Sequence, residues 1–203
     1  MADAAHPKHV QSDHDILQVI RERWSPRAFD PAADVSTSDL ARVFEAARWA
    51  PSSMNEQPWR FLVARRSEPL FAALLGTLTA RNQEWARHAP VLVLVAVRLT
   101  VERSGHANPH AWYDAGQAVA FLSLQATAAG LATRQMQGFD AARAREVCRV
   151  PEAFEPAVVI ALGRIGNPEA LAADHHRAAE RQPRERKAIG EFVFVDEWGR
   201  AFV

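Results

Sequence analysis

Apolar residues recur at helical spacing in several parts of the chain, and proline or polar turns end each pattern. Ile16, Val19 and Ile20 lie three and four positions apart, and Pro26 ends that pattern, so a first helix is expected to finish within residues 21–27. Residues 35–50 predict a second helix that ends at Pro51. Its candidate cap is Ser36, and its apolar stripe consists of Leu40, Val43, Phe44 and Ala47. Three further helical patterns cover residues 67–86, 110–132 and 141–150, the last with Asp140 as a candidate cap.

Short apolar runs between these helices predict β-strands. The run at residues 89–97 has no polar alternation, which indicates burial on both faces. The other predicted strands are residues 59–65, 133–139 and 155–166, and residues 186–199 resume strand character near the end of the chain. The interspersed elements predict a mixed α/β chain with a central sheet and helices packed on it.

Composition narrows the class of protein. A chain of 203 residues is one ordinary domain, expected to span residues 14–203 after a polar, flexible extension at residues 1–13. The formal net charge of zero gives no general attraction to nucleic acid or to an anionic membrane. The first residues lack a signal-peptide core, no window is apolar enough to span a bilayer, and Cys148 is the single cysteine. We therefore expect a soluble, cytoplasmic protein without disulfides.

One polar loop interrupts the pattern between the second helix and the first strand. Residues 50–61 read APSSMNEQPWRF, in which Pro51 and Pro58 stiffen the backbone. The hydrogen-bonding side chains of this loop are Ser52, Ser53, Asn55 and Gln57. Such a loop can hold a heteroaromatic ligand, and it can also be a capped turn that joins a helix to a strand.

Two separate segments present arginine. The first, RERWSPRAF, carries Arg23, Ser25 and Arg27, and the second, RQPRERK, carries Arg184 and Arg186. Planar guanidinium groups suit phosphate oxygens, so the two segments could converge on one phosphate. Taken singly, each segment also fits a solvated surface.

Other motifs are weaker. His106 and His110 are separated by a glycine-containing and proline-containing stretch that favours a loop over a zinc site. Cys148 at an apolar helical position is typical of packing. No G-x-G-x-x-G motif follows a predicted strand, so a resident dinucleotide in a Rossmann unit is excluded. No metal site and no catalytic nucleophile or base is predicted.

Several motifs together resemble the nitroreductase-like family of flavin oxidoreductases. The blocks are RWSPRAF, APSSMNEQPWRF, RNQEWARHAPVLVLV, YDAGQAVAFLSLQATAAGLATRQMQGFD, VVIALGRIG and RERKAIGEFVF, in this order, from about Asp15 to Trp198. The resemblance implies an α+β homodimer with the nitroreductase-like fold, in which helices flank a central mixed β-sheet. It also implies FMN at the subunit interface and NADH or NADPH as the reductant.

The resemblance also implies roles for individual residues. Arg23 and Ser25 would bind the phosphate of FMN, completed by Arg186 with help from Arg184. Arg27 would lie near N1 and O2 of the ring, and Trp24 would contribute mainly backbone. Asn82, or alternatively Gln83, would bond the pyrimidine edge, and the backbone at Gln137 and Gly138 would meet N5. The loop residues from the partner subunit would be Pro51, Ser52, Ser53, Asn55 and Gln57.

The implied activity is two-electron, ping-pong reduction of nitroaromatics, quinones or similar small electrophiles. Two alternatives remain open, namely a family branch with other chemistry, such as reductive dehalogenation or flavin fragmentation, and a flavin-binding module without turnover. The dehalogenating branch would be expected to use a tyrosine-bearing lid, and Tyr113 is the single tyrosine.

The pattern itself also indicates a second copy of the chain. Residues 110–132 are apolar on more faces than one small domain easily covers, and small residues would let another helix approach closely, namely Ala115, Gly116, Ala118 and Ala120. The apolar tail at residues 190–203 is expected to exchange as a C-terminal arm and add to the neighbour's sheet.

Overall fold

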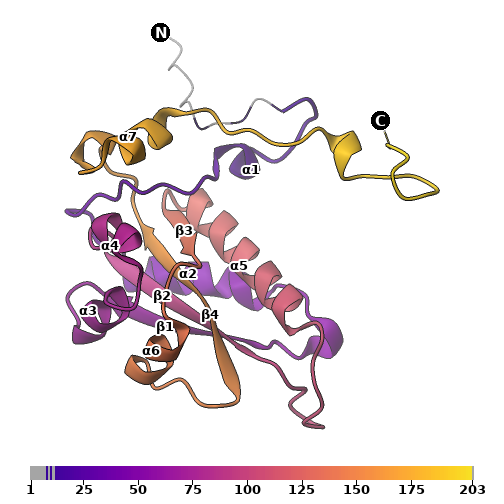
Figure 1. Cartoon of the computed structure of the whole chain (residues 1–203), viewed down its shortest axis with the longest axis horizontal. Coiled ribbons are helices and arrows are strands. Elements are labelled where there is room, and N and C mark those ends of the chain that lie inside the picture. The colour runs from indigo at the N-terminus through magenta and orange to yellow at the C-terminus, as the bar shows by residue number, and fades with distance from the viewer. Residues whose placement is uncertain (1–7, 9, 11, 203) are drawn as a thin grey trace.

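The computed structural model describes residues 8, 10 and 12–202 and is built around a four-stranded sheet (Figure 1). The strands are β1 (Trp59–Arg65), β2 (Val91–Arg98), β3 (Ala132–Met136) and β4 (Phe154–Gly163), in the order β1-β2-β4-β3. Every pairing among them is antiparallel, so the prediction of a mixed sheet is wrong for the described residues. The apolar runs signalled burial on both faces, and such burial does not fix strand direction.

Helices cover both faces of this sheet (Figure 1). The helices α2 (Thr37–Arg48) and α5 (Ala111–Ala128) pack on one face. The other face is covered by α3 (Pro69–Leu75), α4 (Ala80–Ala86) and α6 (Ala141–Val147). The chain therefore has two apolar cores, one on each side of the sheet.

Strand β2 belongs to both cores. Its odd-numbered residues from Val91 to Val97 face the core of α2 and α5, while Leu92 and Leu94 face the opposite core. This alternation is the two-residue period of a β-strand applied to a run that is apolar throughout. The prediction that residues 89–97 are buried on both faces is confirmed.

Side-chain caps begin α2 and α6. The Ser36 hydroxyl accepts a hydrogen bond from the Asp39 backbone N–H at 3.0 Å at the start of α2. The predicted helix at residues 67–86 is instead two helices, α3 and α4. The break is held by a contact distant in sequence, because Thr77 O accepts a hydrogen bond from Asp140 N at 2.8 Å.

The two ends of the domain meet beside β3. The helices α1 (Gln18–Glu22) and α7 (Asp174–Arg181) lie near each other at that end, and α1 stops before Pro26 as predicted (Figure 1). The predicted extension at residues 1–13 lies largely outside the described residues. Among the described helices, none has the length and apolarity to cross a bilayer.

The C-terminal tail leaves the body of the domain (Figure 1). It contains a short 3-10 helix, η3 (Ile189–Glu191), and an isolated bridge between Phe194 and Ala201. The strand predicted for residues 186–199 therefore does not add to the chain's own sheet. Trp198 is 92% exposed.

Candidate functional site

An arginine-lined cavity of about 290 Å³ lies between the segment after α1, strand β3 and the segment after α7. We call it the arginine cavity. It brings together both arginine segments that were predicted to converge. Its lining includes Lys8, Arg23, Trp24, Ser25, Arg27, Arg134, Glu180, Arg184 and Arg186.

Three guanidinium groups crowd one end of this cavity. Arg23 Nη1 donates to Ser25 Oγ at 3.3 Å, and Arg184 donates to the backbone oxygens of Arg21 and Arg23. Burial lowers the pKa of Arg23, and the nearby charge of Arg186 lowers that pKa further. Burial likewise lowers the pKa of Arg184, reinforced by Arg23 and Arg186. An anion at this position would relieve the repulsion among the three cations.

A buried carboxylate holds the wall next to them. Glu180 on α7 is 2% exposed, and its carboxylate accepts the Arg27 N–H at 3.0 Å and the Ala28 N–H at 3.3 Å. The Arg27 guanidinium lies 3.9 Å from the same carboxylate. Sequence reasoning missed Glu180, because a glutamate within the charged run at residues 174–187 reads as solvated.

Arg134 on β3 is a second residue that the sequence did not single out. It donates to Ser25 O, and its guanidinium lies 5.4 Å from the centre of the Trp85 ring. Burial, reinforced mainly by the charge of Arg27, lowers the pKa of Arg134 to about 10. An arginine in a short strand was the available signal, since the strand's other residues alternate toward a core.

At Arg134, the arginine cavity approaches α4 and the end of β3. The charge of Arg81 on α4 contributes to lowering the pKa of both Arg27 and Arg134. Asn82, the next residue, donates from Nδ2 to Gly138 O at 3.2 Å. A Cβ at Gly138 would lie 2.9 Å from that same Nδ2, so a larger residue there would displace the Asn82 side chain.

The remaining predicted residues near this side are placed as follows. Gln83, the alternative to Asn82, donates from Nε2 to Leu78 O at 2.7 Å within its own turn. Gln137 is exposed beside Gly138. Trp24 is buried, and its side chain forms part of the cavity wall.

The polar loop has an unusual backbone. Met54, Asn55 and Gln57 have φ values of 51, 58 and 46 degrees, a left-handed conformation that is uncommon outside glycine. The Ser52 hydroxyl accepts the Gln57 N–H at 3.1 Å, and the Arg60 guanidinium donates to Gln57 O at 3.0 Å. These bonds hold a strained turn, and strain of this kind clusters at ligand sites.

Within one chain this loop does not meet the arginine cavity. Ser53 N donates to Asp114 in the first turn of α5, whereas α1 and α7 lie near the end of α5 where β3 begins (Figure 1). α5 has 18 residues, which makes it about 27 Å long. The loop residues Pro51, Ser52, Ser53, Asn55 and Gln57 are thus at the opposite end of the domain.

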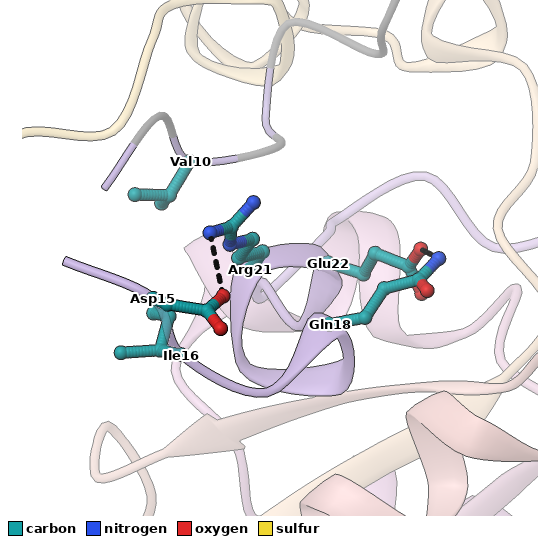
Figure 2. A pocket seen from close by; sticks show the side chains of 6 residues that line it. All are labelled: Val10, Asp15, Ile16, Gln18, Arg21 and Glu22. Carbon is teal, nitrogen blue, oxygen red and sulfur yellow. Dashed lines mark hydrogen bonds and ion pairs between the residues drawn. The ribbon is translucent and has the colours of Figure 1, made fainter. Parts of the chain in front are cut away.

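A second hollow, of about 440 Å³, lies beside α1 (Figure 2). Its polar side chains already pair with one another, Arg21 with Asp15 at 3.4 Å and Gln18 with Glu22. It is a weaker candidate for a ligand site than the arginine cavity, in which positively charged side chains outnumber carboxylates. Among the described residues, no group of three or more His, Cys, Asp or Glu side chains could hold a metal ion.

Comparison with known proteins gives consistent matches. The Nitroreductase family profile matches residues 20–78 and 68–164. An uncharacterised 15.4 kDa protein of Mycolicibacterium smegmatis is 35% identical over 151 residues, which are 69% of this chain and 97% of that protein. A putative NAD(P)H nitroreductase of Bacillus subtilis is 44% identical over 82 residues, which are 40% of this chain and 38% of that protein.

Solved structures agree in fold. A crystal structure of an oxidoreductase containing FMN superposes with a TM-score of 0.89 and 29% identity, covering 98% of this chain and all of the other. A putative nitroreductase from Desulfovibrio desulfuricans in complex with FMN gives a TM-score of 0.70 at 25% identity, covering 92% of this chain and 99% of the other. The profile alone spans more than half of the sequence. The chain belongs to the nitroreductase family.

Proposed function

We propose that the chain is an FMN-dependent NAD(P)H oxidoreductase that reduces nitroaromatics, quinones or similar small electrophiles. The observation that carries this proposal is the arginine cavity, in which Arg23, Arg184 and Arg186 gather beside one buried carboxylate, Glu180. Relatives named as NAD(P)H nitroreductases and solved complexes with FMN support the same cofactor and reductant.

The residues present fit the phosphate of FMN. The buried Nε of Arg184 has no hydrogen-bond partner among the described residues, so this guanidinium keeps donor capacity for a ligand. Arg186 and Ser25 add a charged fork and a hydroxyl at the same end. Asn82 and Gly138, which are joined by a hydrogen bond, would then meet the ring.

The protein's part in the reaction is orientation and electrostatics. FMN supplies the redox chemistry when bound, taking electrons from NAD(P)H and passing them to the acceptor. Arg27 presents a positive charge whose position is fixed by Glu180, and this charge favours the reduced, anionic ring. No nucleophilic side chain is required for this chemistry.

We extend the proposal to a homodimer in which each cofactor contacts both subunits. The polar loop is about one helix length from its own arginine cavity, so a second copy is the means by which it would reach a cofactor. On α5, Trp112, Gly116 and Ala120 form an exposed stripe at helical spacing. Ala115 and Ala118, by contrast, are buried in the chain's own core and leave no face for another helix.

The first test is the absorption spectrum of the purified protein. We expect a yellow protein that releases FMN, and not FAD, on denaturation. A colourless protein that gains no flavin absorbance when FMN is added would refute the cofactor assignment.

A kinetic test addresses the order of the reaction. Reductant and acceptor are expected to use one open face of the flavin in turn, which gives parallel double-reciprocal lines for NAD(P)H against a nitroaromatic or a quinone. Intersecting lines would require a ternary complex instead.

A further inference from the structure

Lys8 caps a helix that is distant in sequence. Its ammonium group donates to Ala179 O at 2.6 Å and also to Gln182 O, at the C-terminal end of α7. The last carbonyls of a helix have no partner within the helix, and a cation there also meets the negative end of the helix dipole. Lys8 is 7% exposed and lies 5.5 Å from the centre of the Trp24 ring, so it is held in place rather than solvated.

A second contact joins the N-terminal segment and the segment after α7 to the end of α1. We call this meeting point the junction. Arg21 O, near the C-terminus of α1, accepts the Val10 N–H at 3.1 Å and also a bond from the Arg184 guanidinium. The side chain of Arg21 turns to Asp15 on the outer surface, with Val10 close by (Figure 2). The N-terminal segment, α1 and the segment after α7 therefore meet at two helix ends.

This junction forms one wall of the arginine cavity. Lys8 lines the cavity, and the helix end that it caps lies directly before Arg184 and Arg186. Lys8 and Val10 precede residue 20, where the match to the family profile begins.

We propose that the N-terminal segment at Lys8 and Val10 is a positioning element of the cofactor site: it fixes the end of α7 so that Arg184 and Arg186 stay opposite Arg23. The role in cofactor binding rests on the proposed function, whereas the anchoring of the segment after α7 does not. The Arg184 guanidinium also holds this segment through Arg21 O and Arg23 O. Because the arginines repel one another, loss of the Lys8 contacts would leave these bonds alone to resist movement of the segment away from Arg23.

Limited trypsin digestion tests the anchoring without reference to any flavin. Lys8→Met keeps an unbranched side chain that is one atom shorter and removes the charge and the donors. We expect tryptic cleavage after Arg184, followed by mass spectrometry as the fragment that ends at Arg184, to become about three- to tenfold faster than in the unmodified full-length chain. Lys8→Arg should restore protection. Arg103→Met, on an exposed loop, is the matched loss of one positive charge and should leave the rate unchanged.

Titration with FMN and with riboflavin tests the effect on the site. Riboflavin lacks the phosphate. If Arg184 and Arg186 are out of position, the affinity for FMN should therefore fall by about three- to tenfold, and the affinity for riboflavin should change little. Val10→Pro removes the Val10 N–H and changes no charge, and it should lower the FMN-to-riboflavin affinity ratio in the same direction. This separates positioning from the bare charge of Lys8.

The outcomes separate the two claims. Unchanged cleavage after Arg184 in Lys8→Met would overturn the anchoring role, whether or not the FMN affinity is lowered. Equal losses for FMN and riboflavin would overturn the role in positioning the phosphate-binding arginines, since they indicate general destabilisation. Faster cleavage in a protein that binds neither flavin would uphold the anchoring and refute the proposed cofactor.

Discussion

Asp114 in the first turn of α5 accepts the backbone N–H of Ser53 at 3.0 Å, and Asp114 is only 2% exposed. A buried carboxylate is costly unless its oxygens are paired, and the first turn of a helix favours negative charge. This one bond therefore ties the strained polar loop to the start of α5. The loop's left-handed residues follow directly after the anchored Ser53.

Replacing Asp114 by alanine should release the loop. Loss of a hydrogen bond to a charged group is expected to lower the free energy of unfolding by about 1.5–3 kcal/mol, measured by urea denaturation. Asp114→Asn keeps an acceptor oxygen and should cost less. An alanine variant as stable as the unmodified protein would show that the bond does not hold the loop.

Arg186 should matter for the phosphate and little for folding. Its side chain is exposed at the rim of the arginine cavity, so Arg186→Ala leaves both cores intact. We expect FMN to bind about tenfold or more weakly, by titration, because a charge-assisted contact is lost. The neighbouring exposed Lys187→Ala is the control. If the two variants bind FMN equally well, the phosphate site lies elsewhere.

Stability should fall on acidification because of His176 on α7. Burial lowers the pKa of His176 from 6.5, reinforced by the charges of Arg27 and His175, while Glu84 opposes the shift. As pH falls below about 6.5, the unfolded chain takes up the proton before the folded chain does, so the free energy of unfolding decreases, by at most about 1.4 kcal/mol per pH unit. This contribution is fully present above that pH.

Urea unfolding at pH 7.5 and at pH 5.5 measures the effect. The decrease should be smaller in His176→Gln, whose side chain does not titrate, and unchanged in the exposed His110→Gln. An equal decrease in the unmodified protein and in His176→Gln would assign the acid sensitivity to other groups.

The proposed dimer can be tested on the exposed stripe of α5. Ala120→Arg places a long charged side chain on this stripe, one helical turn after Gly116. Dimerisation, measured by light scattering, and flavin content, measured by absorbance, should therefore fall together. Ala153→Arg, in an exposed turn before β4, is the control. A monodisperse monomer that keeps FMN and turns over NAD(P)H would refute both the interface and the assignment of the loop to a partner's cofactor.

Local patterns predicted most of the elements because their signals are local. The predicted bounds of β1 agree with the structure, and the Ser36 and Asp140 caps are confirmed, since a cap depends on residues three positions apart. The break between α3 and α4 was missed because it depends on a contact between Thr77 and Asp140. A helical pattern likewise gave no warning that Ala115 faces the chain's own core.

Some residues of the candidate site could likewise be recognised from the sequence, and others could not. The arginine segments were visible from residue type, and guanidinium chemistry raised their convergence on one phosphate beside the alternative of a solvated surface. The resemblance to a known family favoured convergence. Lys8, Arg134 and Glu180 carry charges that are buried only after folding brings distant partners together. In the sequence such residues cannot be distinguished from solvated ones, because nothing local marks their partners.

Strand β2 contributes residues to both apolar cores and therefore couples their unfolding. Consecutive residues such as Val93 and Leu94 belong to opposite cores, so neither core can open without disturbing the backbone on which the other depends. Two apolar layers that might have unfolded separately are thereby joined into one cooperative unit. A heated sample should therefore show a single calorimetric transition for the sheet and both of its helical layers.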